Sequence, residues 1–308
     1  MKKTALLFAG QGAQVVGMGK DLADKFPPAK KWFDRANAAL GFDLTSICFN
    51  GPEAELTKTE NAQPGIFLVS WVTFELLKDQ VPGLAFDATA GLSLGEFTAL
   101  TTAGAMTFED GLRVVRQRGK FMQEACDATR GGMAAIIGLD EAPTRDVCEQ
   151  AGVTLANLNC PGQIVISGEA ERINSAVELA KAKGARKAIP LPVAGAYHSP
   201  LMASAQPKLQ AELSRIKIST PQFAVVSNVT AQPHGADIAA RLVEQVCSSV
   251  LWENSMRWLL AQGFTRFIEL GPGTALSGFM KRIDKSVQML NVADSASLEA
   301  TVNVLRAA

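Results

Sequence analysis

The chain has 308 residues, 47% hydrophobic and 19% charged, so it can bury a large core as one large domain or two smaller ones. Lysine and arginine together number 30, as do aspartate and glutamate, and this balance speaks against a nucleic-acid or membrane partner held by long-range charge. The five cysteines are odd in number and lack CxxC spacing, which speaks against a disulfide framework or a zinc site and favours reduced thiols in the cytoplasm.

The N-terminus begins with two lysines and a short apolar run, as a secretion signal does. Gly10 interrupts the run close to the lower limit of roughly 7 residues for an apolar signal core, and no small-x-small cleavage site follows cleanly. No apolar stretch approaches the ~20 residues that a membrane span needs. We therefore expect a cytoplasmic protein with no membrane partner.

Strands and helices alternate in the N-terminal part of the chain. A short buried strand is predicted over 6–9, and it ends in the loop GQGAQ at 10–14, where glycine lets the backbone approach a ligand closely. A helix over 61–78 and a weak strand over 85–90 follow. This alternation predicts a layered α/β domain.

The segment GLSLG at 91–95 lies between that weak strand and a helical run over 96–102. This context fits a nucleophile elbow, whose tight turn needs small residues on both sides of the serine and exposes its hydroxyl. Ser93 is then the candidate nucleophile, and the backbone N–H of Leu94 points to where an oxyanion would form. The alternative interpretation is an ordinary turn flanked by glycines.

The helix predicted over 108–126 carries an arginine on its apolar face. At 100° per residue Arg118 falls among Val114, Val115, Phe121 and Met122. The opposite, polar face carries Arg113, Arg116, Gln117, Lys120 and Glu124. A guanidinium on the apolar face keeps its proton and needs an anion, because a stranded buried charge costs roughly 3 to 5 kcal/mol. The partner is either an internal Asp or Glu or a substrate carboxylate, and the nearby serine elbow favours the substrate.

Between about 131 and 193 the pattern changes to short elements in the order β-α-β-β-α-β. This is the split βαβ, or ferredoxin-like, arrangement, and it predicts a small domain inserted into the larger one. The predicted elements are strands at 132–138, 153–159, 163–167 and 187–191, and helices at 141–151 and 173–180. The larger domain then resumes, with a strand predicted at 224–229, helices at 237–250 and 252–262, a strand at 266–270, and a final strand and helix.

A serine nucleophile needs a base, and the sequence has only two histidines. His234 lies in a polar turn, AQPHG, where a solvated side chain is the simpler interpretation. His198 lies where the inserted domain returns to the larger one, and such junctions often form clefts. We favour His198 as the base.

Five segments, in order and over nearly the full length, resemble the malonyl-CoA:acyl-carrier-protein transacylase family. They are GQGAQ at 10–14, GLSLGE at 91–96, RQRG at 116–119, GAYHSPLM at 195–202 and ELGPG at 269–273. The resemblance implies an α/β-hydrolase-like core formed by 1–128 and 198–308, with a ferredoxin-like subdomain at 129–197. We further expect a cytoplasmic monomer that needs no cofactor or metal.

The resemblance assigns roles to single residues of this chain. Ser93 is similar to the family's nucleophile, His198 to its base, and Arg118 to the clamp on the malonyl carboxylate. The backbone N–H groups of Gln11 and Leu94 match the oxyanion hole. Two further matches are Gln245, at the position whose main-chain carbonyl orients the histidine, and Gln63, which lines the pocket.

Two residues depart from the family pattern. Leu92 stands where most similar sequences carry His before the nucleophile, which changes a wall of the pocket, so we expect altered affinity or acyl preference. Tyr197 stands where Phe is usual, and its added hydroxyl is expected to be tolerated.

The predicted activity is transfer of malonyl from coenzyme A to the phosphopantetheine thiol of holo acyl carrier protein, through malonyl-Ser93, for fatty-acid elongation. The alternatives are an acyl hydrolase, a polyketide-synthase acyltransferase on the same fold, and a non-catalytic module that binds carrier protein. Arg118 speaks against a general esterase, and the presence of Ser93 and His198 speaks against a decayed module. Surface charges at Lys281, Arg282, Arg186 and Lys187 are either a docking patch for an acidic carrier or ordinary solvated charges.

Overall fold

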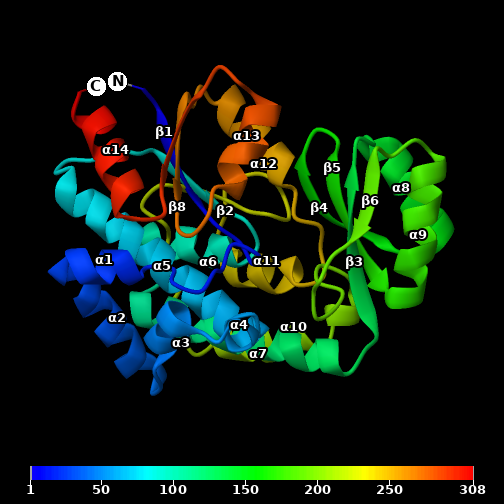
Figure 1. Cartoon of the computed structure of the whole chain (residues 1–308), viewed down its shortest axis with the longest axis horizontal. Helices are drawn as coiled ribbons and strands as arrows, with labels where there is room; N and C mark the ends of the chain where they lie inside the picture. Colours follow the sequence, from blue (N-terminus) through cyan, green and yellow to red (C-terminus); the bar gives the residue numbers. More distant parts are fainter. Residues whose placement is uncertain (1, 308) are drawn as a thin grey trace. The chain divides into compact units, whose positions relative to one another are not determined.

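The computed structural model describes residues 2–307, and these form two compact units (Figure 1). The first unit holds the chain up to Gly119, the segment Ile216–Val226 and the chain from Leu259 onward. The second unit holds Lys120–Arg215 and Ser227–Trp258. It therefore contains the stretch 129–197 together with flanking residues, and the narrower limits expected from sequence stay a prediction.

A parallel sheet forms the centre of the first unit. Its strand order is β7-β2-β1-β8-β9, and every neighbouring pair runs parallel. The strands are β1 (Thr4–Phe8), β2 (Ala88–Gly91), β7 (Ala224–Val226), β8 (Arg266–Leu270) and β9 (Gln288–Val292). All five residues of β1 are buried, as expected for a central strand covered on both faces.

The helices of this unit are α1 (Lys20–Lys25), α2 (Pro27–Leu40), α3 (Leu44–Asn50), α4 (Glu53–Leu56), α5 (Thr59–Gln80), α6 (Leu94–Thr102), α13 (Ala275–Ile283) and α14 (Ser295–Arg306). Of these, α5, α6, α13 and α14 pack against the sheet, and α2, α3 and α4 pack against α5. Two more, α7 (Phe108–Asp127) and α12 (Trp252–Ala261), continue from one unit into the other along the chain. The central α5 is buried over most of its length, including Gln63, Pro64 and Gly65. The sequence pattern predicts α5 to α7, but we predicted no element over the region of α1 to α4.

The second unit contains a four-stranded antiparallel sheet of order β4-β5-β3-β6. Its elements in chain order are β3 (Gly131–Ile137), α8 (Glu141–Ala151), β4 (Thr154–Cys160), β5 (Gln163–Glu169), α9 (Ala170–Ala182) and β6 (Lys187–Pro190). Apolar side chains of α8 and α9 pack with those of the strands in one core. This order and packing confirm the predicted split βαβ arrangement.

Three shorter elements complete the second unit: η1 (Pro200–Met202), α10 (Ala205–Leu213) and α11 (Ile238–Gln245). The helix predicted over 237–250 is wrong in its C-terminal part, since α11 ends at Gln245. The reason is a competing pairing, because the N–H of Val250 donates to Ala156 and its carbonyl accepts from Leu158 on β4. Across the part of the chain that the structure describes, no helix combines the length and apolar character needed to cross a membrane.

Candidate active site

The turn between β2 and α6 holds Ser93 in an unusual backbone conformation. Its φ of 53° and ψ of −105° are sterically costly for any residue that carries a side chain. The turn is tight because its two glycines are in contact: a Cβ on Gly91 would lie 1.9 Å from the carbonyl carbon of Gly95. A Cβ on Gly95 would in turn lie 2.3 Å from the carbonyl oxygen of Phe8 on β1. The structure therefore has the strand, sharp turn and helix of a nucleophile elbow.

Gly95→Ala is expected to lower the free energy of unfolding by about 3 kcal/mol or more, because backbone atoms cannot yield as a side chain would. Urea denaturation measures this loss. Gly278→Ala is the matched control, since a Cβ at this position of α13 meets nothing within 4 Å. It should gain about 0.5 to 1 kcal/mol from helix propensity. Equal stability of the two variants would contradict the tight elbow.

The loop that follows β1 lies against this elbow. The N–H of Leu92 donates to the Phe8 carbonyl at 3.1 Å. A Cβ on Gly10 would lie 2.6 Å from the Leu92 carbonyl oxygen and 3.1 Å from its Cδ2. The side chain of Leu92 thus packs on the backbone just before Gln11, and the backbone of Gln11 and of Leu94 belongs to two segments in direct contact.

Arg118 is buried, with 1% of its surface exposed, and it contacts the elbow directly. Its Nη1 donates to Oε1 of Gln63 at 2.6 Å, and its Nη2 donates to Oγ of Ser93 at 3.0 Å. The guanidinium carbon lies 5.5 Å from the centre of the Phe97 ring. Arg118 therefore lies on the apolar face of α7, as predicted, and its guanidinium is next to the candidate nucleophile.

Amide side chains extend this contact into a hydrogen-bonded series. Nε2 of Gln63 donates to Oε1 of Gln11 at 3.4 Å, and Nε2 of Gln11 donates to Oγ1 of Thr59 at 3.4 Å. The structure thus brings Gln11, Gln63, Ser93 and Arg118 together. Thr59, the fully buried first residue of α5, was not predicted, because a threonine at a helix start carries no signal of its own.

In the second unit, His198 is buried and also has a positive φ, of 57°. Its Nδ1 lies 2.9 Å from the backbone carbonyl oxygen of Gln245. A carbonyl only accepts, so this contact requires the proton on Nδ1 and leaves the lone pair on Nε2. The Gln245 side chain donates to Oδ1 of Asn228 at 3.4 Å, and Asn228 is a further residue that the sequence did not indicate.

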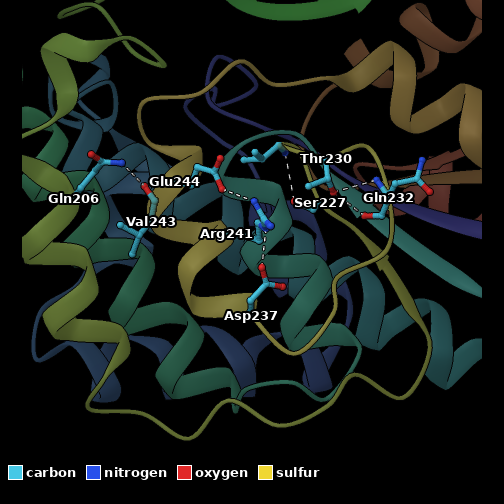
Figure 2. Close-up of polar contacts among 9 residues, drawn as sticks. Gln206, Ser227, Thr230, Gln232, Asp237, Arg241, Val243 and Glu244 are labelled. Carbon is cyan, nitrogen blue, oxygen red and sulfur yellow. Dashed lines mark hydrogen bonds and ion pairs between the residues drawn. The ribbon is translucent and has the colours of Figure 1, made fainter.

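The carbonyl that orients His198 stands at the end of a well-braced helix. Figure 2 shows Arg241 of α11 between Asp237 and Glu244. Its Nε donates to Oδ2 of Asp237 at 2.8 Å, and its Nη1 donates to Oε2 of Glu244 at 2.7 Å. In the same view Gln206 of α10 donates to the Val243 carbonyl at 3.1 Å. These contacts tie α11 internally and to α10, which limits the movement of the carbonyl at its end.

The cysteine thiols with shifted pKa values are poor candidates for the nucleophile. Burial raises the pKa of Cys48 and Cys148 to about 12 and that of Cys247 to about 11. Burial also raises the pKa of Cys126 to about 11, although a hydrogen bond with Tyr197 opposes the rise. These thiols stay protonated near neutral pH, and a thiol is a weak nucleophile in that form.

The described residues were also compared with two expectations from the sequence, the absence of a metal site and a basic patch for a carrier protein. Among residues 2–307 no group of three or more His, Cys, Asp or Glu side chains is arranged to hold a metal ion. Lys281 and Arg282 are exposed in the first unit, and Arg186 and Lys187 are exposed in the second. Their exposure suits either interpretation of these charges.

Comparison with known proteins shows which family this chain resembles. Residues 5–294 match the model of the acyl transferase domain. The chain is 45% identical to the malonyl CoA-acyl carrier protein transacylase of Bacillus subtilis (strain 168), over 99% of this chain and 98% of the relative. It is 42% identical to the protein of that name from Escherichia coli (strain K12), over 92% of this chain and 93% of the relative.

Solved structures agree with these sequence matches. The crystal structure of malonyl CoA-acyl carrier protein transacylase from Clostridium perfringens superposes with a TM-score of 0.95 at 43% identity, covering 99% of this chain and 98% of that one. A malonyl-transacylase in complex with a type II PKS acyl-carrier protein superposes with a TM-score of 0.94 at 38% identity, covering 98% and 99%.

Proposed function

The chain belongs to the acyl transferase domain family, among its malonyl CoA-acyl carrier protein transacylases, and from that membership we propose how its own residues transfer a malonyl group. It moves malonyl from coenzyme A to acyl carrier protein, the step that supplies fatty-acid synthesis. One observation supports the residue assignment most strongly: a buried guanidinium donates a hydrogen bond to the hydroxyl of an elbow serine, 3.0 Å away.

In the first half of the reaction, Ser93 Oγ attacks the thioester carbonyl and its proton passes to Nε2 of His198. The new C–O bond forms, the C–S bond breaks, and coenzyme A leaves as a thiol with that proton. Backbone N–H groups of Gln11 and Leu94 stabilise the oxyanion between these events. The product is malonyl-Ser93.

In the second half, the phosphopantetheine thiol of the carrier protein gives its proton to His198 and attacks the ester carbonyl. The new C–S bond forms, the C–O bond breaks, and Ser93 recovers its proton. The Gln245 carbonyl keeps Nδ1 of His198 protonated throughout, so that Nε2 is the ring nitrogen that accepts and returns a proton in each half.

Arg118 holds the free carboxylate of the malonyl group. A guanidinium binds a carboxylate through two parallel N–H bonds, and here it is buried among Phe97, Gln63 and the elbow, where such bonds are strong. Gln63 fixes the plane of the guanidinium from one side. Acyl groups without a carboxylate leave the cation uncompensated, which gives selectivity.

The proposal is tested by intact-protein mass spectrometry after mixing the chain with malonyl-CoA. A single malonyl adduct should form, and it should disappear when holo acyl carrier protein is added and becomes malonylated. Acetyl-CoA is the matched control and should give little adduct. Malonylation of the carrier without any enzyme adduct would contradict the two-step mechanism.

His198→Ala is expected to lower kcat for malonyl transfer by about 10² to 10⁴, the usual contribution of a general base. His234→Ala is the control at the other histidine and should keep kcat within about twofold. Steady-state kinetics with holo carrier protein measures both. A wild-type kcat in His198→Ala would remove this residue from the mechanism.

The carrier is expected to be that of fatty-acid synthesis, although a relative with this fold is solved with a polyketide carrier protein. Transfer rates to purified fatty-acid and polyketide carriers would rank them. The monomeric state and the cytoplasmic location remain predictions.

A further inference from the structure

Helix α7 carries two glycines, Gly111 and Gly119, inside its span. Glycine within a helix costs roughly 0.5 to 1 kcal/mol relative to alanine, so both positions call for a reason in the packing. Each lies against α5. A Cβ on Gly111 would meet Phe67 of α5, and a Cβ on Gly119 would meet Thr59 at the start of α5. The two helices therefore run antiparallel in close contact.

The two contacts differ in what would have to move. At Gly111 the nearest atoms are side-chain atoms, Oγ1 of Thr101 at 2.5 Å and Cζ of Phe67 at 2.9 Å. At Gly119 they are all backbone, the carbonyl oxygen of Thr59 at 2.5 Å and Cα of Glu60 at 3.0 Å. At Gly111 the buried side chains of Thr101 and Phe67 would have to shift, whereas at Gly119 two helix backbones would have to separate. Gly119 is thus the point where any added atom pushes α7 off α5.

The contact between Gly119 and Thr59 lies next to Arg118, the proposed ligand of the malonyl carboxylate, on both helices. On α7, the residue before Gly119 is Arg118. On α5, Gln63 lies one turn after Thr59 and accepts the 2.6 Å bond from Arg118. The Thr59 hydroxyl also accepts a hydrogen bond from the Gln11 side chain. Thr59 therefore contacts the loop after β1 through its side chain and α7 through its backbone.

We propose that Gly119 is a positioning residue that sets acyl selectivity, because its missing side chain lets α7 approach α5 closely enough to place Arg118 beside Ser93. This inference rests on the proposed malonyl transfer at that site. Gly119 touches no reacting atom and acts through Arg118. The backbone of the elbow, which serves every acyl group, is held by its own contacts with β1.

The test is Gly119→Ala. Its Cβ would stand 2.5 Å from the Thr59 carbonyl oxygen, whereas ordinary contact begins at 3.4 Å, so the helices must part by several tenths of an ångström. A displacement near 1 Å at a reacting site costs up to about 100-fold. We expect kcat/KM for malonyl transfer to fall by about 10- to 100-fold. Hydrolysis of p-nitrophenyl acetate, whose acyl group is neutral, should stay within about twofold.

Gly111→Ala is the matched control on the same helix. It should lower thermal stability but keep the ratio of malonyl transfer to acetate hydrolysis within about twofold of wild type. If Gly119→Ala yields little folded protein, the same substitution is measured in the Gly278→Ala background, which helix propensity stabilises.

Three results would overturn the proposal: an unchanged ratio in Gly119→Ala, an equal fall of the ratio in Gly111→Ala, or no folded Gly119→Ala chain in either background. In the last case the contact serves the fold rather than selectivity. A wild-type chain that forms no malonyl adduct would instead contradict the proposed function itself, so the two failures are told apart.

Discussion

Ser93→Ala is expected to lower kcat for malonyl transfer by about 10⁴ to 10⁶ and to abolish the malonyl adduct. The size of the effect follows from the mechanism, since without Oγ there is no atom to carry the acyl group between the two thiols. Losses of this order accompany removal of a serine nucleophile from other enzymes. Transfer kinetics and intact-protein mass spectrometry measure the two consequences separately.

The control for this variant is Ser175→Ala, at an exposed position of α9, which should behave as wild type. Thermal unfolding of Ser93→Ala should show a folded protein, because its β-carbon is already accommodated in the turn. A malonyl adduct that persists in Ser93→Ala would place the acyl group on another residue and end the mechanism.

Arg118→Ala is expected to lower kcat/KM for malonyl transfer by about 10² to 10⁴. A buried charge that loses its partner costs roughly 3 to 5 kcal/mol, and every 1.36 kcal/mol is a factor of ten in rate. Here the stranded charge is the malonyl carboxylate. Reaction with neutral acyl thioesters should not fall, so the preference for malonyl over acetyl should shrink by the same factor.

Arg116→Ala is the matched control, two residues away on α7. Its guanidinium lies over the Phe42 ring at 3.9 Å rather than at the elbow, so malonyl selectivity should be retained. Arg118→Lys should recover only part of the activity, because an ammonium cannot offer two parallel N–H bonds. Wild-type selectivity in Arg118→Ala would show that the carboxylate is bound elsewhere.

Much of the fold was predictable because many of its elements have a strong apolar pattern. In the second unit, the segment from β3 to β6 has short apolar strands and amphipathic helices that are easily told apart in the sequence. The predicted order of these elements is the one observed. By contrast, α1 to α4 show no strong apolar stripe, since even α2, with 14 residues, buries only Ala29, Phe33 and Ala36, and packing decides their limits. Packing also decides the end of α11, which gives way after Gln245 to backbone pairing with β4.

The site was predictable to the extent that single residues break a local rule. Arg118 interrupts an apolar face, and the serine of GLSLG stands between two glycines in a strand-to-helix turn. Thr59 and Asn228 do not depart from any local sequence pattern. Their hydrogen-bond partners, Gln11 and Gln245, are distant in the sequence and come close only in the folded chain. The sequence gives no reason for a glycine at position 119, because its contact with the backbone of α5 is visible only in the structure.

Among the residues that the structure describes, only Ser93, His198 and Ala231 have a positive φ without being glycine. Such a conformation costs on the order of 1 to 3 kcal/mol, and glycine would relieve it. Glycine at Ser93 or His198 would therefore stabilise the fold but remove the proposed nucleophile or base, so at these two positions folding stability and the proposed catalysis oppose each other.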